Sequence, residues 1–189
     1  MGNEKGMRWN HIGRMPCSIA RTLEVVGERW TMLVLREAFG GAHRFEEFQR
    51  SLGVARNVLA TRLAALVRHG ILARALYRER PRRFEYRLTE KGFDLYPVVV
   101  AMMRWGDRWL AGADGPPLVL IHKACEHDIA PALTCGHCGA AIGARDVRAV
   151  VGPGLMNLGR PRGKRESREV RGRRATRRGS GRGRRSVAP

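Results

Sequence analysis

Two short amphipathic patterns separated by a tight turn constrain the fold of this chain more than any other feature of its sequence. The first pattern spans residues 45–52 and stops at Gly53, and the second is under way within four residues and runs over about 56–69. The second carries one apolar stripe, made of Leu59, Leu63, Leu66 and Val67. Two short helices joined by a turn that contains glycine are the signature of a helix-turn-helix. We therefore predict a helix-turn-helix over these residues, and the apolar helix at 30–39 is expected to be central to the core.

The face of the second helix opposite its apolar stripe is small, polar and basic. It holds Asn57, Ala60, Thr61, Ala64 and Arg68, and no acid or large apolar group. Such a face could be an ordinary solvated surface, or it could enter the major groove of DNA and offer side chains to base edges.

The groove interpretation assigns separate roles to the polar residues of this helix. Arg56, Asn57 and Thr61 near its start are expected to contact bases, because asparagine pairs bidentately with adenine and arginine with guanine. Arg62 and Arg68 are the weaker candidates, for phosphate contacts.

A basic hairpin is expected directly after these helices, and it favours the groove interpretation. Strand-like runs at 71–77 and 84–88 flank a connector of six residues. Its arginines are Arg78, Arg80, Arg82 and Arg83, and only Glu79 offsets their charge. Like charges this close repel one another, so a chain that retains them has an anionic partner or uses them for solubility. In the second run Phe84, Tyr86 and Leu88 alternate with Glu85 and Arg87, which predicts a half-buried strand. We expect a wing whose tip lies along phosphates or reaches into the minor groove.

The overall charge also indicates a polyanionic partner. Lys and Arg number 36 against 17 Asp and Glu, a net charge of +19. This attracts nucleic acid first, although an acidic membrane surface is not excluded by charge alone. The longest apolar run, "YPVVVAMM", is too short to span a bilayer, and the start "MGNEKGMRWN" has no leader pattern. We expect a cytoplasmic, nucleoid-associated protein, and no enzyme, because nucleophile-elbow, zinc-protease and P-loop motifs are missing from the sequence.

Residues 90–111 predict a long helix that needs a partner. Apolar side chains occupy every side of it, and one small domain cannot cover them all. A second copy of the chain is the simplest cover, and Pro97 is expected to kink or divide the helix.

Four segments in register resemble the HxlR-type transcriptional regulators, relatives of the MarR group. They are "CSIARTLEVVGERWTMLVLREAF", "RFEEFQRSL", "NVLATRLAALVRHGIL" and "YRERPRRFEYRLTEKGFDLYPVVVAMMRWG". The resemblance implies a mainly α fold with a small β-hairpin wing, a winged helix-turn-helix with a C-terminal dimerisation helix. It also implies a homodimer on double-stranded operator DNA that usually represses and sometimes activates nearby genes.

The chain is expected to have four parts. They are a flexible arm (1–16), the winged-helix and dimerisation domain (17–112), a small Cys/His segment (118–151) and a disordered Arg/Gly-rich tail (153–189). From Arg160 to Arg185 the tail holds thirteen Arg or Lys against two Glu. It could be a nonspecific nucleic-acid arm that gains affinity by counterion release, or unselected coding sequence. The alternative function is therefore a nonspecific nucleic-acid-binding protein driven by the tail.

The Cys/His segment predicts a structural zinc site. His122 and Cys125 form H-x-x-C, and Cys135 and Cys138 form C-x-x-C, which together supply the Cys3His ligand set of a closed site. His127 and His137 are alternative ligands if the metal binds a different combination of these residues. The other interpretation is a set of small thiols without metal.

Cys17 stands apart, just before the first helix. A helix N-terminus can lower a thiol pKa and favour reactivity, and some HxlR-type proteins use a cysteine at the matching place as an oxidation switch. Cys17 is thus a candidate redox switch, or a small residue that packs the helix start.

Overall fold

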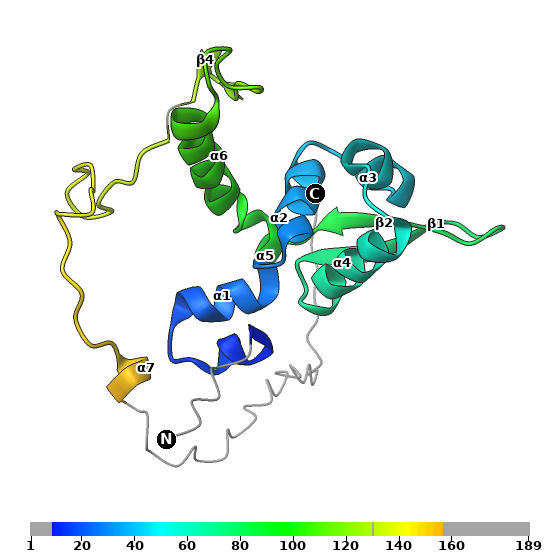
Figure 1. Cartoon of the computed structure of the whole chain (residues 1–189), viewed down its shortest axis with the longest axis horizontal. Coiled ribbons are helices and arrows are strands. Elements are labelled where there is room, and N and C mark those ends of the chain that lie inside the picture. Colours follow the sequence, from blue (N-terminus) through cyan, green and yellow to red (C-terminus); the bar gives the residue numbers. More distant parts are fainter. Residues whose placement is uncertain (1–8, 130, 157–189) are drawn as a thin grey trace, which may run out of the picture. The chain divides into compact units, whose positions relative to one another are not determined.

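The computed structural model describes residues 9–129 and 131–156 of the chain, and it divides the chain into two compact units, 1–151 and 152–189. The first unit is mainly helical with a two-stranded hairpin (Figure 1). Its elements are η1 (Trp9–Arg14), α1 (Ser18–Val26), α2 (Arg29–Phe39), α3 (Phe45–Leu52), α4 (Arg56–Arg68), β1 (Leu72–Arg78), β2 (Arg83–Leu88), α5 (Glu90–Phe93), α6 (Tyr96–Leu110), β3 (Ile121–His122) and β4 (His127–Asp128). None of the helices within these described residues is long and apolar enough to cross a membrane.

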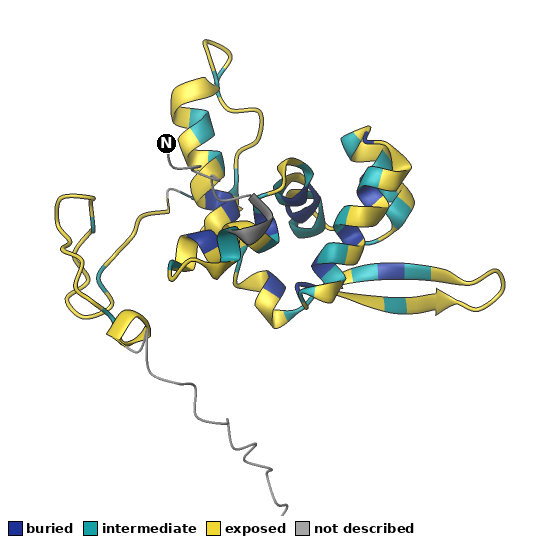
Figure 2. Ribbon diagram, turned by 60° about the horizontal axis from the view of Figure 1, so that its bottom comes forward, coloured by how far each residue is buried: buried dark blue, intermediate teal, exposed yellow. Residues whose placement is uncertain are grey.

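The core lies where α2, α3 and α4 meet the base of the hairpin. Its most deeply buried side chains are Val34, Leu35, Phe48, Leu59, Leu63, Leu66, Ile71 and Leu72. Figure 2 shows the buried residues gathered on these helices and at the helical end of the hairpin. The predicted stripe of the second helix is confirmed at Leu59, Leu63 and Leu66, whereas Val67 is half-buried at its edge.

A three-residue turn sets the angle between α3 and α4. Gly53 ends α3 with φ of 60°, a left-handed conformation that glycine adopts without strain, and its N–H donates to the carbonyl of Gln49 at 2.9 Å. Val54, in the middle of the turn, is buried in the core. The turn therefore anchors α4 to the core at its N-terminus.

The hairpin is longer than its sequence predicts. β1 and β2 pair antiparallel from Leu72 opposite Leu88 to Arg78 opposite Arg83, with an irregularity between Leu76 and Arg78. The connector therefore has four residues, 79–82, instead of six. Backbone pairing needs no apolar side chains, so the strands continue into the arginine-rich stretch, which the apolar pattern alone could not show.

The segment before α3 contacts β2 through an isolated bridge. Arg44 forms an antiparallel bridge with Glu85, and the N–H of Tyr86 donates to the carbonyl of His43 at 2.7 Å. Glu85 is consequently buried, with 9% of its surface exposed, and its carboxylate accepts from Arg87 Nε at 2.7 Å. The alternation of β2 predicts an outward-facing Glu85, which is wrong, because a segment forty residues earlier covers this strand.

The apolar stretch after the hairpin forms two helices, α5 and α6, in agreement with the expected division of this helix at Pro97. Pro97 lies in the first turn of α6, where a missing N–H costs nothing, so it marks the division. Thr89 caps α5 by accepting from Gly92 N at 3.1 Å and donates to the carbonyl of Gly70 at 2.7 Å. Gly92 packs so closely on the carbonyl of Ile71 that any side chain at this position would collide with it.

Both ends of the chain differ from their predictions where they are described. Residues 9–14 of the predicted flexible arm form η1, which lies against α1. A six-residue 3₁₀ helix is too short to give a periodic apolar pattern, so the sequence could not indicate it. In the second unit, Pro153–Met156 of the predicted disordered tail form the one-turn helix α7. Residues 1–8 and 157–189, the remainder of these two predictions, lie outside the described residues.

Candidate nucleic-acid interface

The polar face of α4 is exposed along its whole length. Leu59, Leu63 and Leu66 bury the opposite side against α2 and α3, so the helix cannot turn without opening the core. The exposed residues are those that the sequence predicts: Asn57, Ala60, Thr61, Ala64 and Arg68. The structure brings them together as one face, referred to below as the α4 face.

Contacts across the helix-turn-helix hold the start of α4. Arg56 donates from Nη1 to Gln49 Oε1 at 2.8 Å, and its guanidinium carbon lies 4.8 Å from the ring centroid of Phe45. Both partners belong to α3. The hydroxyl of Thr61 donates to the carbonyl of Asn57 at 2.8 Å, which leaves its oxygen able to accept from a ligand. Arg56 is thus restrained at the flank of the α4 face, with Asn57 and Thr61 at its centre.

Arg62 does not lie on this face. Only 22% of its side chain is exposed, and Nη1 lies 3.7 Å from Glu28 Oε2, just before α2. Its Nε is buried with no hydrogen-bond partner among the described residues. The position of Arg62 therefore does not support the predicted phosphate contact. The Arg62 side chain instead connects α4 to the start of α2.

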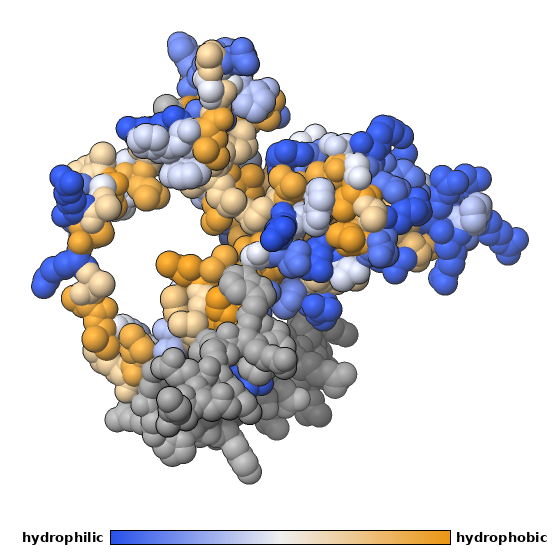
Figure 3. Space-filling model, in the orientation of Figure 1, coloured by the Kyte–Doolittle hydropathy of each residue, from blue (hydrophilic) through white to orange (hydrophobic). Residues whose placement is uncertain are grey.

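The wing presents its arginines to solvent. Arg78, Arg80, Arg82 and Arg83 are all exposed, and Arg78 Nε donates to the carbonyl of Arg80 at 3.1 Å. Figure 3 shows strongly hydrophilic residues over the hairpin and the neighbouring helices. The wing tip, defined as residues 78–83, is a projecting cationic strip suited to phosphates.

Two further arginines lie on the faces of the hairpin, and sequence reasoning missed both. The guanidinium of Arg74 lies 3.5 Å from the ring centroid of Phe84, and that of Arg44 lies 4.9 Å from the ring centroid of Tyr77. Arg74 could have been found from its place in the first strand-like run. Arg44 could not, because only the bridge to β2 brings it to the wing.

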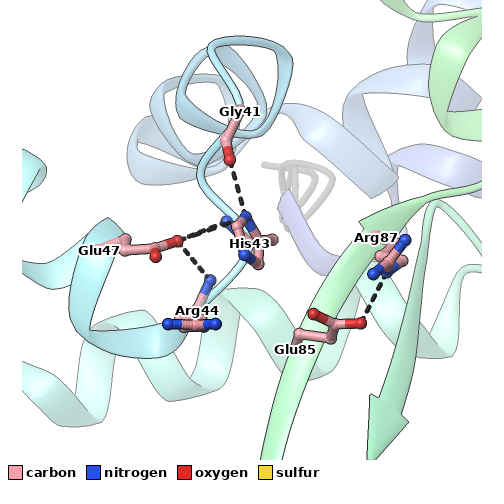
Figure 4. A network of polar contacts seen from close by, with 6 residues as sticks. All are labelled: Gly41, His43, Arg44, Glu47, Glu85 and Arg87. Carbon is pink, nitrogen blue, oxygen red and sulfur yellow. Dashed lines mark hydrogen bonds and ion pairs between the residues drawn. The ribbon is translucent and has the colours of Figure 1, made fainter. Parts of the chain in front are cut away.

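A carboxylate fixes the segment that joins α2 to α3 beside the wing (Figure 4). Glu47 Oε2 accepts from the backbone N–H groups of His43 and Arg44, each at 2.9 Å, and the ring of His43 contacts the carbonyl of Gly41 at 2.9 Å. The hydrogen bond from His43 N, aided by that from Arg44 N, lowers the pKa of Glu47 below its ordinary value. The position of Arg44 against β2 therefore depends on this cap.

A second exposed surface is apolar and lies on α1 and α6. A groove at these helices is lined by Ile19 and Leu23 of α1, Val98 and Met102 of α6 and Met32 of α2, among others. Ile19 is 72% exposed and Met102 is 55% exposed, and Trp105 and Trp109 farther along α6 are exposed to a similar degree. Orange residues lie at the surface around α1 in Figure 3. We refer to this surface as the α1/α6 face.

Cys17 is the residue before α1. It has extended backbone and its thiol is free and partly buried. The position agrees with either interpretation, the oxidation switch or a packing residue, so redox sensing stays a prediction.

The Cys/His segment forms two separate turns. His122 Nδ1 lies 3.2 Å from Cys125 Sγ in the first, and Cys135 and Cys138 lie in contact in the second. The hydrogen bond from Cys138 N, followed by that from His137 N, lowers the pKa of the Cys135 thiol. Over residues 9–129 and 131–156, the structure gathers no three Cys, His, Asp or Glu side chains into a metal-binding group. The predicted four-ligand set is therefore present as two pairs.

Comparison with known proteins connects this architecture to DNA-binding regulators. The profile of the HxlR-like helix-turn-helix family matches residues 25–114. The uncharacterized HTH-type transcriptional regulator Rv3095 of Mycobacterium tuberculosis is 49% identical over 138 residues, which covers 73% of this chain and 87% of the relative. A second uncharacterized HTH-type regulator, from Synechocystis, is 39% identical over 95 residues, 50% of this chain and 70% of its own length.

Solved structures give the same result. The crystal structure of PA1607, a candidate transcription factor, superimposes with a TM-score of 0.65 at 38% identity and covers 71% of this chain and 94% of that chain. A second candidate transcription factor, from Pseudomonas aeruginosa, has a TM-score of 0.54 at 37% identity, with 72% and 93% covered. The winged helix-turn-helix fold predicted from the sequence is thereby confirmed.

Proposed function

We propose that the chain represses transcription as a homodimer on an inverted-repeat operator. The chain belongs to the HxlR-like helix-turn-helix transcriptional regulators, so it binds DNA as a regulator and is not an enzyme. The observation that carries this proposal is the α4 face, which is exposed, free of acids and followed directly by the cationic wing tip. The α4 face contacts base edges and reads the sequence directly. The wing tip binds phosphates, which adds affinity and fixes the position of the protein on DNA. A dimer that occupies promoter DNA represses by excluding other proteins from it.

The α1/α6 face supports the homodimer. Large apolar side chains exposed together mark an interaction surface, because water solvates them poorly. Two copies that bury this face against each other form a two-fold symmetric dimer. Such a dimer places its two α4 helices about 34 Å apart, one turn of DNA, and so reads an inverted repeat.

The dimer is tested by placing a charge on the α1/α6 face. Met102→Asp should convert the full chain from dimer to monomer in sedimentation equilibrium and should weaken operator binding, because an unpaired carboxylate would be buried at the interface. Val150→Asp is the matched control, since Val150 is 75% exposed outside this face. A Met102→Asp variant that stays dimeric at all concentrations would place the interface elsewhere.

The operator is tested by footprinting on the DNA upstream of the chain's own gene. We expect a discrete protected site with two half-sites about 10 base pairs apart, centre to centre. Transcription in vitro from this promoter should fall as the protein is added. Protection without any preferred site would contradict the operator, and a rise in transcription would contradict repression while leaving DNA binding intact.

A further inference from the structure

The two turns of the Cys/His segment share one backbone geometry. In the first, the N–H of Glu126 donates to the carbonyl of His122 at 2.8 Å, and in the second the N–H of Gly139 donates to the carbonyl of Cys135 at 2.8 Å. The closing residue of each turn has positive φ, 55° at Glu126 and 73° at Gly139. Positive φ is uncommon for a residue other than glycine, so Glu126 indicates a turn shape that its surroundings maintain.

Each turn places its two donor atoms close enough for one metal ion. The Nδ1 of His122 and the Sγ of Cys125 are 3.2 Å apart. Tetrahedral zinc with bonds of about 2.0 Å to nitrogen and about 2.3 Å to sulfur separates two such ligands by roughly 3.5 Å. The alternative ligand His127 is turned away, because its Nδ1 contacts the carbonyl of Cys125. We refer to the two turns as the His122 knuckle and the Cys135 knuckle.

The backbone of the Cys135 knuckle wraps around its first sulfur. The N–H groups of His137 and Cys138 donate to the Cys135 sulfur. Hydrogen bonds of this kind orient a cysteine that binds a metal.

The segment around the knuckles has no hydrophobic core of its own. None of the described residues from 112 to 151 is buried, and the local sheet consists of the two-residue strands β3 and β4 and a single bridge between Thr134 and Ala141. Units this small need a disulfide or a metal to be stable, because they bury too little apolar surface. All three cysteines of the segment are free thiols, so a metal is the remaining way to stabilise it.

We propose that the His122 and Cys135 knuckles close around a single zinc ion within one chain, with His122, Cys125, Cys135 and Cys138 as ligands. The knuckles are separate in the structure, and zinc binding draws them together. Residues 126–134 between them can span about 30 Å when extended, so chain length does not prevent closure. With four protein ligands the zinc is structural, and its binding releases the protons of the three thiols.

The test begins with metal content. The full chain, purified under reducing conditions without chelators, should contain one zinc per chain by mass spectrometry of the metal. In that form only Cys17 should react rapidly with a thiol reagent, and all four cysteines should react after zinc is removed. Zinc-free protein titrated with Co²⁺ should develop the intense visible bands of tetrahedral cobalt together with a thiolate charge-transfer band.

Variants separate the ligands from their neighbours. Cys138→Ser and Cys125→Ser should abolish stoichiometric zinc, whereas His137→Asn and Cys17→Ser should retain it, since both lie outside the ligand set. Wild-type protein that carries no zinc, takes up no Co²⁺ and exposes four reactive thiols overturns the proposal without reliance on any variant. One zinc for every two chains would also overturn it, because the ion would then lie between two copies.

Discussion

Asn57 lies in the first turn of α4, at the centre of the exposed face, where the N-terminal residues of a recognition helix meet base edges. Thr61 and Arg56 are the other two residues expected to contact bases. Thr61 lies one turn farther along the same face, and Arg56 is held at the flank by Gln49 and Phe45. Sequence-specific recognition by this chain should therefore depend on Asn57 more than on any arginine.

Replacement of Asn57 tests this assignment. Asn57→Ala should lose about 1–3 kcal/mol of discrimination between the operator and a scrambled site, because one bidentate pair with a base disappears. Competition binding on the two DNAs measures the difference. Ala64→Ser, a small change on the same face, is the control, and an Asn57→Ala variant that weakens both DNAs equally would refute the reading role.

Glu47 gives a residue-scale test of the support beneath the wing. Glu47→Gln should lower the free energy of unfolding by about 0.3–1 kcal/mol at neutral pH, because a neutral amide accepts weaker hydrogen bonds than a carboxylate and carries no charge at the N-terminus of α3. The folded-state pKa of Glu47 is depressed, so its contribution is complete above the unfolded-state pKa and disappears as the pH falls through the lower folded-state value. The difference between wild type and variant in urea unfolding should therefore shrink in acid. Glu46→Gln, exposed on the same turn, is the matched control, and an equal loss in both variants would exclude the cap as the cause.

Single residues also show where sequence reasoning reaches its limit. The exposure of Asn57, Thr61 and Arg68 follows from helical periodicity, which fixes the face opposite the apolar stripe. Arg62 and Glu85 do not follow from periodicity. Their environments are set by Glu28 and by the 43–44 segment, which approach only in the folded chain.

Among the elements, the sequence predicts the helices and their breaks well, and the length of the hairpin less well. α3, α4 and the turn at Gly53 agree with the sequence within a residue or so, because apolar spacing and a glycine stop define both. The division between α5 and α6 follows from Pro97, whereas the extension of the hairpin to Arg83 depends on backbone hydrogen bonds that side-chain patterns do not encode. This extension shortens the loop at the wing tip to four residues.

The wing tip should contribute affinity without much specificity. Arg82→Ala should weaken binding to operator and random DNA almost equally and reduce the slope of log K against log salt by about one, since one phosphate contact releases about one counterion. Arg145→Ala, an exposed arginine outside the wing, is the control. A loss confined to the operator would instead assign base readout to Arg82.

At the scale of the whole molecule, the net charge of +19 combines two sources that act differently. The arginines of the winged-helix unit are held on defined elements, so they can support one register on DNA. The tail from Arg160 to Arg185 lies outside the described residues, and its sequence has no apolar pattern that would fix it to a surface. The proposed operator binding therefore assigns specificity to the first unit and leaves the tail a general electrostatic role.

Removal of the tail distinguishes the regulator from the alternative of a nonspecific binder. A chain that ends at Gly152 should protect the same operator as the full chain, with lower overall affinity and a smaller salt dependence, because thirteen basic residues no longer release counterions. Footprinting of both proteins over a series of salt concentrations measures the protected DNA site and the slope of log K against log salt together. The control is the full chain with Asn57→Ala, which should keep the salt slope and show a weaker preference for the site. If the shortened chain binds no DNA while the full chain binds every sequence alike, the tail is the functional part and the proposed operator is wrong.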